Sequence, residues 1–176
     1  MSKSLLSKIC SFFTYQSNEK LKIYVVDDVE NYAKLVSINL EEAGYSDVEL
    51  FYNGEDVVSK LKDESPDCII LDHILSEYGL NGGDVLNYTR INNPRVKTII
   101  LSGQENLEVA SKVIKQGAYD YIIKNDMAFF NLSNVLSSLE VSINVKRKSD
   151  WVTKRNKLLY TITIILIWVI ALLFIF

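Results

Sequence analysis

The sequence predicts an α/β domain with a doubly wound, five-stranded parallel sheet, followed by one C-terminal transmembrane helix. Three observations lead to this prediction. Five short runs rich in β-branched residues alternate with stretches of helical periodicity. Four of these runs end in a polar residue, which has no packing role in a strand covered by helices. The last 19 residues contain no charged residue, no glycine and no proline.

The strands are short and almost wholly apolar, which is typical of a parallel sheet covered by helices on both faces. The five expected strands are LKIYVVD at 21–27, VELFY at 48–52, CIIL at 68–71, VKTIIL at 96–101 and YDYII at 119–123.

Helical periodicity follows each expected strand. Apolar residues fall on one face between Val29 and Ala43, and Gly44 and Gly117 are suitable helix stops. No glycine or proline follows Gly117, so the last helix can continue into the apolar end of the chain. The remaining helices are expected up to about Leu61, near 84–91, around Leu107–Ile114 and through Leu132–Ile143.

The charge is distributed unevenly. Residues 21–145 carry 10 basic and 20 acidic side chains, residues 146–157 have a net charge of +5, and residues 1–20 have +2. This pattern predicts a domain at 21–145, a basic collar at 146–157, an apolar segment at 158–176, and an N-terminal segment at 1–20. No nucleic-acid binding is expected of the domain, because phosphates would meet a negative surface.

The apolar segment 158–176 is interpreted as a transmembrane helix. Its 19 residues would span roughly 28 Å as a helix, close to the hydrocarbon core of a bilayer. The alternative is a buried core helix, but core helices usually keep a polar stripe and this segment is apolar all round. Basic flanks stay cytoplasmic, so the acidic domain is expected in the cytoplasm. Residues 1–20 are expected to form a short interfacial helix, a helix packed on the domain or a loose terminus.

The rare residues exclude two kinds of site. Two cysteines, Cys10 and Cys68, cannot build a disulfide framework. His73 is the single histidine, which excludes multi-ligand His/Cys zinc sites and leaves little room for histidine catalysis.

Polar residues close the first, third, fourth and fifth expected strands: Asp27 and Asp28, Asp72, Ser102, and Lys124. In a sheet of order 2-1-3-4-5 these four strands are contiguous, so their side chains would converge at the carboxyl edge, where such sheets bind ligands. Three clustered carboxylates repel one another unless a cation joins them, and oxygen ligands suit Mg²⁺. Together with a lysine and a hydroxyl they match the needs of a phosphoryl group in transfer, with Asp72 as the expected acceptor.

Four motifs in register carry a family resemblance: YVVDD, IILDHIL, TIILSG and GAYDYIIK. Residues 21–145 resemble the receiver domain of two-component response regulators. The intervals between Asp28, Asp72, Ser102 and Lys124 suit that family, and Tyr121 matches its aromatic switch residue.

The resemblance implies a flavodoxin-like sheet and a phosphoacceptor role for Asp72. It implies that Asp27, Asp28, Asp72 and the backbone carbonyl of Ile74 hold Mg²⁺, and that Ser102, Lys124 and Tyr121 bind the phosphoryl group and switch. The implied partners are a sensor histidine kinase or phosphotransfer protein and an unknown output protein. The apolar segment 158–176 adds the membrane as an expected partner. The chain is expected to be a single-pass protein of the plasma (inner) membrane of a bacterium, with its domain in the cytoplasm. It is not expected to be an enzyme beyond assisting its own phosphoryl transfer and dephosphorylation.

The chain departs from the family pattern at two positions. Asn125 stands where the family usually has proline after the lysine, and Ser76 stands where it usually has proline four residues beyond the acceptor. Both changes concern the placement of the lysine and of the loop after the acceptor.

Two alternatives remain at this point. One is a degenerate receiver that acts as a phosphorylation-independent membrane scaffold. The other is a phosphatase of the haloacid dehalogenase class, which also uses an Asp nucleophile with Mg²⁺. That chemistry needs a second Asp two residues after the first, and here the residue is Ile74.

Overall fold

The computed structural model describes residues 20–75 and 79–175. Residues 1–19 of the N-terminal segment and Ser76 therefore lie outside the described residues. Residues Lys20–Ser138 form one compact unit, and the part of the long C-terminal helix from Leu139 onward belongs to a second.

The first unit contains a five-stranded sheet of order β2-β1-β3-β4-β5, and every pair of neighbouring strands is parallel. The predicted sheet and its strand order are confirmed. The strands are β1 (Lys22–Val26), β2 (Asp47–Phe51), β3 (Cys68–Asp72), β4 (Lys97–Ser102) and β5 (Asp120–Ile123).

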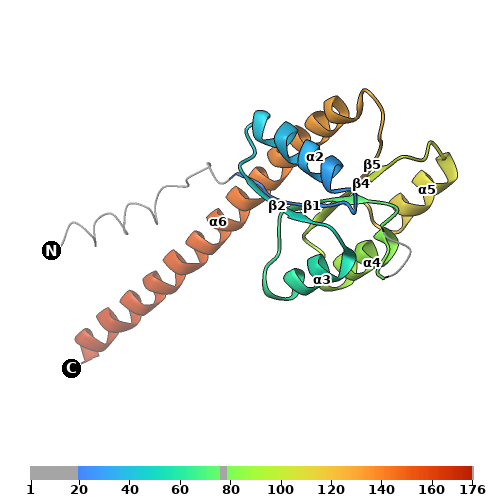
Figure 1. Cartoon of the computed structure of the whole chain (residues 1–176). Helices are drawn as coiled ribbons and strands as arrows, with labels where there is room; N and C mark the ends of the chain where they lie inside the picture. The colour runs from blue at the N-terminus through green and yellow to red at the C-terminus, as the bar shows by residue number, and fades with distance from the viewer. Residues whose placement is uncertain (1–19, 76–78, 176) are drawn as a thin grey trace. The chain divides into compact units, whose positions relative to one another are not determined.

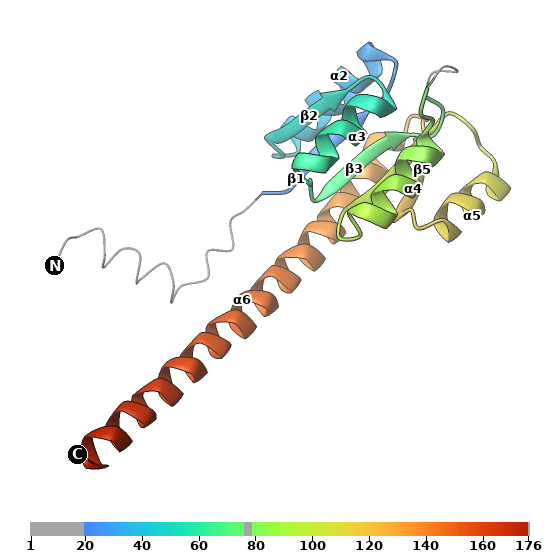
Figure 2. The same cartoon turned by 90° about the horizontal axis from the view of Figure 1, so that it is seen from below.

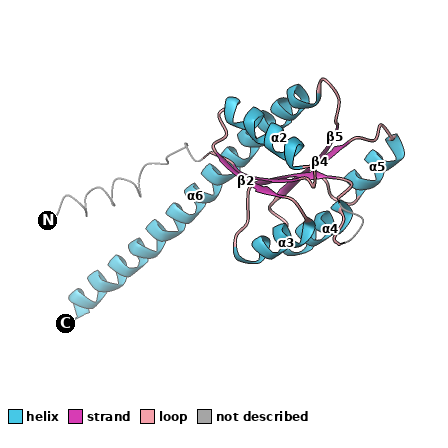
Figure 3. Ribbon diagram, viewed as in Figure 1, coloured by secondary structure: helices cyan, strands magenta, loops and turns pink. Residues whose placement is uncertain are grey.

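Helices cover both faces of the sheet (Figures 1 and 3). Helix α2 and the first turns of α6 lie on one face, and α3 and α4 lie on the other. The view from below separates α3, α4 and α5 along the sheet (Figure 2). The helices are α2 (Glu30–Glu42), α3 (Gly54–Asp63), α4 (Gly82–Asn92), α5 (Leu107–Lys115) and α6 (Ala128–Ile175).

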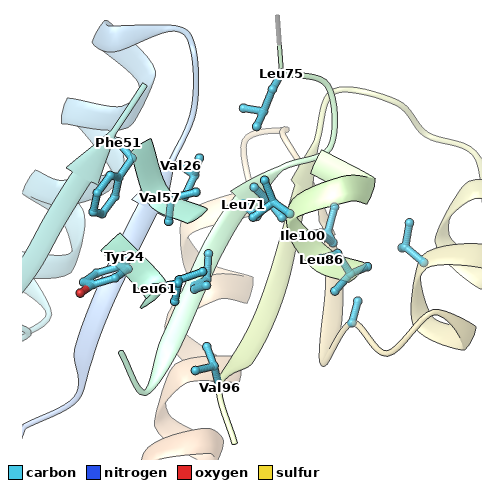
Figure 4. Packing of buried hydrophobic residues seen from close by; sticks show 14 residues of the cluster. Tyr24, Val26, Phe51, Val57, Leu61, Leu71, Leu75, Leu86, Val96 and Ile100 are labelled. Atoms are coloured by element: carbon cyan, nitrogen blue, oxygen red, sulfur yellow. The ribbon is translucent and has the colours of Figure 1, made fainter. Parts of the chain in front are cut away.

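The core explains why these segments form these elements. The central strand β3 is buried along its whole length, so its Cys-Ile-Ile-Leu run meets helices on both sides. On one face a cluster joins the sheet to α3, α4 and α5, and Figure 4 shows Leu71 and Ile100 of neighbouring strands within it. On the other face α2 buries Ala33, Val36 and Leu40, and α6 buries Ala128, Leu132 and Leu136.

Helix α6 continues to Ile175 without a break. Among the described residues it is the one helix long and apolar enough to cross a membrane, by length and composition. Its most apolar stretch is not buried inside the protein. Trp168 is 67% exposed and Ile167 is 65% exposed, which differs from the core helix that was the alternative interpretation of this segment.

Candidate functional site

The polar strand ends lie together at the carboxyl edge of the sheet. Asp27 follows β1, Asp72 ends β3, Ser102 ends β4 and Lys124 follows β5. The strands are paired in parallel, with Asp72 opposite Leu101 and Ser102 opposite Ile123. The structure therefore brings all four positions, which are far apart in the sequence, to one place.

Lys124 is the centre of this site. Its Nζ donates a hydrogen bond of 2.7 Å to Asp27 Oδ2 and another of 2.7 Å to Asp72 Oδ2. The lysine side chain is only 17% exposed, so both ion pairs are shielded from water. The second oxygen of each carboxylate accepts a backbone N–H, from Val29 for Asp27 and from Ile74 for Asp72. Every polar group of this pair of carboxylates is therefore satisfied within the fold.

Burial and the neighbouring charges have opposite effects on the pKa values of Asp27 and Lys124. Burial raises the pKa of Asp27 above its ordinary value, although the hydrogen bond from Lys124 partly offsets the effect. Burial alone would lower the pKa of Lys124, but its bonds to Asp27 and Asp72 outweigh burial and raise that pKa. The lysine is therefore held protonated.

Asp28 completes a group of three carboxylates. One oxygen each from Asp27, Asp28 and Asp72 lies within 4.8 Å of the others, and Asp28 is the exposed member. With Lys124 as the one cation bonded to the two buried carboxylates, the fully ionised group has a net charge of about −2. Such a set of hard oxygen donors fits a divalent cation of the Mg²⁺ type.

Ser102 and Tyr121 are joined through a residue that the sequence analysis did not single out. The Ser102 hydroxyl is fully buried and accepts the backbone N–H of Gln104 at 3.2 Å. The Tyr121 hydroxyl donates to the carbonyl of the same residue at 2.6 Å. Gln104 thus links the Ser102 hydroxyl at the end of β4 with the Tyr121 ring of β5. No pattern in the sequence marks it, because both contacts are made by its backbone.

Tyr32 is a second residue that sequence reasoning assigned only to a helix face. Lys124 Nζ lies 4.4 Å from the centroid of its ring, a cation–π contact. The ring also stacks on Phe129 of α6, with centroids 6.2 Å apart. Tyr32 therefore covers the lysine from the side of α2, and burial raises the pKa of its hydroxyl.

Comparison with known proteins agrees with this geometry. The sequence profile of the response regulator receiver domain matches residues 23–132. The chain belongs to this family. Receiver domains are signalling domains that bind Mg²⁺ at an acidic pocket, which here corresponds to the three carboxylates. A receiver domain also implies a histidine kinase or phosphotransfer protein as partner.

Individual relatives cover the same part of the chain. The nitrogen assimilation regulatory protein NtrX of Azorhizobium caulinodans is 33% identical over 102 residues, 58% of this chain and 22% of its own length. The NtrX-like putative response regulator of Rickettsia felis is 31% identical over 105 residues, 60% of this chain and 22% of its own. The matched region thus spans about a fifth of these relatives.

Solved structures agree on the fold. The receiver domain of NtrX from Brucella abortus superimposes with a TM-score of 0.60 at 26% identity, covering 68% of this chain and 98% of its own. The receiver domain of the Francisella response regulator 1452 gives 0.64 at 24% identity over 70% and 99%.

Asn125, which stands where the family usually has proline after the lysine, forms local hydrogen bonds. The N–H of Asn125 donates to the carbonyl of Ile123 at 2.9 Å, a bond that a proline could not form. The Asn125 side chain accepts the N–H of Met127 at 3.0 Å, just before α6 begins. The asparagine therefore forms a turn of its own into α6 while Lys124 still reaches both carboxylates.

The loop after Asp72 approaches the strand closely. A Cβ atom at Gly82 would overlap the backbone carbonyls of Asp72 and His73, so only glycine fits at the start of α4. Asn81 before it forms a reciprocal capping box with Asp84, which fixes where the helix begins.

Replacing Lys124 by methionine is expected to change the pH dependence of stability. Without the ammonium, the pKa of Asp27 rises further above that of the unfolded chain, so the folded state takes up a proton more readily than the unfolded state. The free energy of unfolding of Lys124→Met should then increase as the pH falls from 8 to 5, by about 1.4 kcal/mol for each unit of additional pKa shift. Urea unfolding of the full chain in detergent at several pH values measures this slope.

Lys62→Met is the matched control, because Lys62 is exposed and takes part in no ion pair among the described residues. Its slope should equal that of the wild type. Equal slopes for Lys124→Met and the wild type would contradict the electrostatic account of the site.

Proposed function

We propose that this chain is a membrane-tethered, single-domain response regulator that accepts a phosphoryl group on Asp72 from a histidine kinase or phosphotransfer protein. One observation carries the proposal: Lys124 Nζ lies 2.7 Å from carboxylate oxygens of both Asp27 and Asp72 at the carboxyl edge of the sheet. A buried carboxylate beside a fixed ammonium group is a nucleophile whose product charge is already balanced.

The transfer step follows from this arrangement. An Asp72 carboxylate oxygen forms a bond to phosphorus while the P–N bond of the donor phosphohistidine breaks. The bonding electrons stay on the departing imidazole, which takes a proton from solvent. Lys124, now bonded to Asp72 Oδ2, turns to the phosphoryl oxygens and offsets their charge. Ser102 can donate its hydroxyl hydrogen to the same group once it faces the pocket.

Asp27, Asp28 and Asp72 are the residues that would hold Mg²⁺, together with the backbone carbonyl of Ile74. The three carboxylates fit this ion because their oxygens lie within 4.8 Å of one another and carry more negative charge than Lys124 balances. A bound Mg²⁺ would supply charge stabilisation for the oxygens of the transferred group. Asp28, the exposed member, would be reached first from solvent.

The signal would leave the site through Gln104. If the Ser102 hydroxyl turns to the phosphoryl group, its bond to the Gln104 N–H is lost. The carbonyl of that residue holds the Tyr121 hydroxyl, so the ring is released at the same time. The loop before α5 and the Tyr121 ring would therefore change together, and this surface would be read by an output protein whose identity is unknown.

Tyr121→Phe tests this coupling. It removes the hydrogen bond to Gln104 but no group of the pocket, so phosphoryl labelling should stay within about twofold while the loop response weakens. The amide NMR shift of Gln104 caused by beryllofluoride should shrink by roughly half or more, because one of the two hydrogen bonds of the Gln104 backbone is lost. Tyr119→Phe, in an exposed ring two residues earlier, should leave both readouts unchanged. An undiminished shift in Tyr121→Phe would contradict the coupling.

Tethering is proposed from the apolar segment 158–176 and the basic collar 146–157. The collar favours the cytoplasmic side, which would place the receiver at the plasma membrane of a bacterium with its domain inside. Exposure of apolar side chains along α6, such as Leu173 at 75%, supports a lipid environment for this segment.

Labelling with acetyl phosphate tests the proposed function against its two alternatives. The full chain in detergent should acquire a hydroxylamine-labile phosphate with Mg²⁺ and lose this labelling with EDTA. Absence of labelling with and without Mg²⁺ would favour the phosphorylation-independent scaffold. Continuous release of phosphate from several substrates would favour the phosphatase, although Ile74 is 53% exposed and offers no acid or base where that enzyme class has its second Asp.

A further inference from the structure

A second polar hollow lies at the amino edge of the sheet, where the strands begin, at the opposite end from the carboxylates. It has a volume of about 270 Å³ and lies between the end of α4, the start of β4 and the turn that joins α5 to β5. Its lining includes Leu86, Arg90, Lys97, Thr98, Ala118 and Tyr119. Its volume is close to the lower end of the range for small-ligand sites.

The floor of this hollow contains a threonine hydroxyl. Thr98 is only 3% exposed. Val96 and Ile100 pack in the cluster beneath α4 (Figure 4). Side chains at alternate positions of a strand point to the same face, so the Thr98 side chain points the same way. No described group forms a hydrogen bond with the Thr98 hydroxyl. A hydroxyl group without a protein partner can donate a hydrogen bond to a ligand that enters the hollow.

The rim of the hollow carries cations without counterions. Within the described part of the chain, the Arg90 guanidinium donates a hydrogen bond to the amide oxygen of Asn87, at 3.2 Å. Lys97 Nζ lies 5.8 Å from the centroid of the Tyr119 ring. Neither side chain forms an ion pair with a carboxylate among the described residues, although acidic residues outnumber basic ones two to one in residues 21–145. Two adjacent unpaired cations in an acidic domain mark a place suited to an anion.

Two carboxylates at the amino ends of the strands have hydrogen-bond partners within the fold. Asp67, which precedes β3, accepts the backbone N–H of Lys22, and Asp120, which begins β5, accepts that of Tyr121. The last carbonyls of α5 accept the N–H groups of residues 116–118. The partial negative charge of this helix end is therefore reduced by its own cap.

Gly117 shapes the hollow beside Arg90. Its φ is +104°, a conformation that favours glycine, and a Cβ there would lie 2.9 Å from Arg90 Cδ. The missing side chain lets the arginine stem lie against the turn, so that its guanidinium remains at the rim.

We propose that this hollow binds a phosphate-bearing anion. Arg90 would donate paired N–H groups to phosphate oxygens, the Thr98 hydroxyl would donate from the floor, and Lys97 would add a second positive charge. The phosphate can belong to a soluble phosphate ester or to a lipid headgroup. The site lies at the edge opposite Asp72, so it is independent of the proposed phosphoryl transfer.

Titration of the full chain with inorganic phosphate tests the site. The protein is held in maltoside micelles with EDTA, so that the carboxylate cluster takes up no metal. The amide NMR signals of Thr98 and Gly117 should shift saturably, and equal ionic strength of chloride should leave them unmoved. Arg90→Gln should weaken binding by roughly tenfold or more and Thr98→Val by about threefold. Lys62→Gln, another unpaired cation, and Asp72→Asn should leave it unchanged.

Bilayer nanodiscs distinguish the two sources of phosphate. A shift of the same signals in phosphatidylglycerol discs without added phosphate, absent in phosphatidylcholine discs, would identify a lipid headgroup. A shift that needs added phosphate in both lipids would identify a soluble ligand. The proposal is overturned if neither condition moves these signals, or if Arg90→Gln binds phosphate as tightly as the wild type.

Discussion

Asp72→Asn should reduce phosphoryl labelling by acetyl phosphate at least 100-fold. The amide lacks the negative charge and the nucleophilic oxygen of the carboxylate, so no acyl phosphate can form. The fold should persist, because an amide oxygen can still accept the N–H of Ile74, as Asp72 Oδ1 does at 3.2 Å. Radiolabel incorporation into the full chain, followed by hydroxylamine treatment, measures the loss.

Asp126→Asn is the matched control for this variant. It removes the same charge from an exposed position just after Lys124, and labelling should remain at the wild-type level. Substantial labelling of Asp72→Asn would place the acceptor on another residue and contradict the assigned role of the pocket.

Removing residues 158–176 should move the protein from the membrane fraction to the soluble fraction. The described side chains of this segment, up to Leu173, are exposed, and the buried core residues of the described chain all lie upstream of it. The truncated protein should therefore still be labelled at the wild-type rate. A single Ile167→Arg substitution should also reduce the membrane-bound fraction, although less than the deletion does. An arginine near the middle of a span costs about 2.5–3.5 kcal/mol in insertion.

Fractionation in carbonate and accessibility of a C-terminal tag to external protease check this prediction. Lys148→Gln keeps five of the six basic side chains of the collar and should remain in the membrane with its receiver inside. Recovery of the wild-type chain in the soluble fraction would contradict the tether.

The sheet could be predicted because its three central strands, β1, β3 and β4, are buried almost along their whole length, which leaves continuous apolar runs in the sequence. The convergence of Asp27, Asp72, Ser102 and Lys124 could be predicted for a related reason. Parallel strands end at one edge, so a polar residue at each strand end suffices to locate the pocket.

The remaining features of the site could not be predicted because they depend on tertiary contacts. Tyr32 looked like a core residue of α2, and only the fold shows that its ring faces Lys124. Gln104 acts through its backbone, which no side-chain pattern reveals. The unpaired cations Arg90 and Lys97 are ordinary surface residues until the fold places them around one hollow.

Binding of beryllofluoride with Mg²⁺ tests the central claim most directly, because this complex imitates a phosphoryl group on an Asp carboxylate without the transfer step. Amide NMR signals of Ser102, Gln104 and Tyr121 are followed in the full chain and in Asp72→Asn. The wild type should show saturable, Mg²⁺-dependent shifts at all three residues, and Asp72→Asn should show none. Equal responses in the two proteins, or no response in the wild type, would contradict a phosphoacceptor at Asp72 and favour the phosphorylation-independent scaffold.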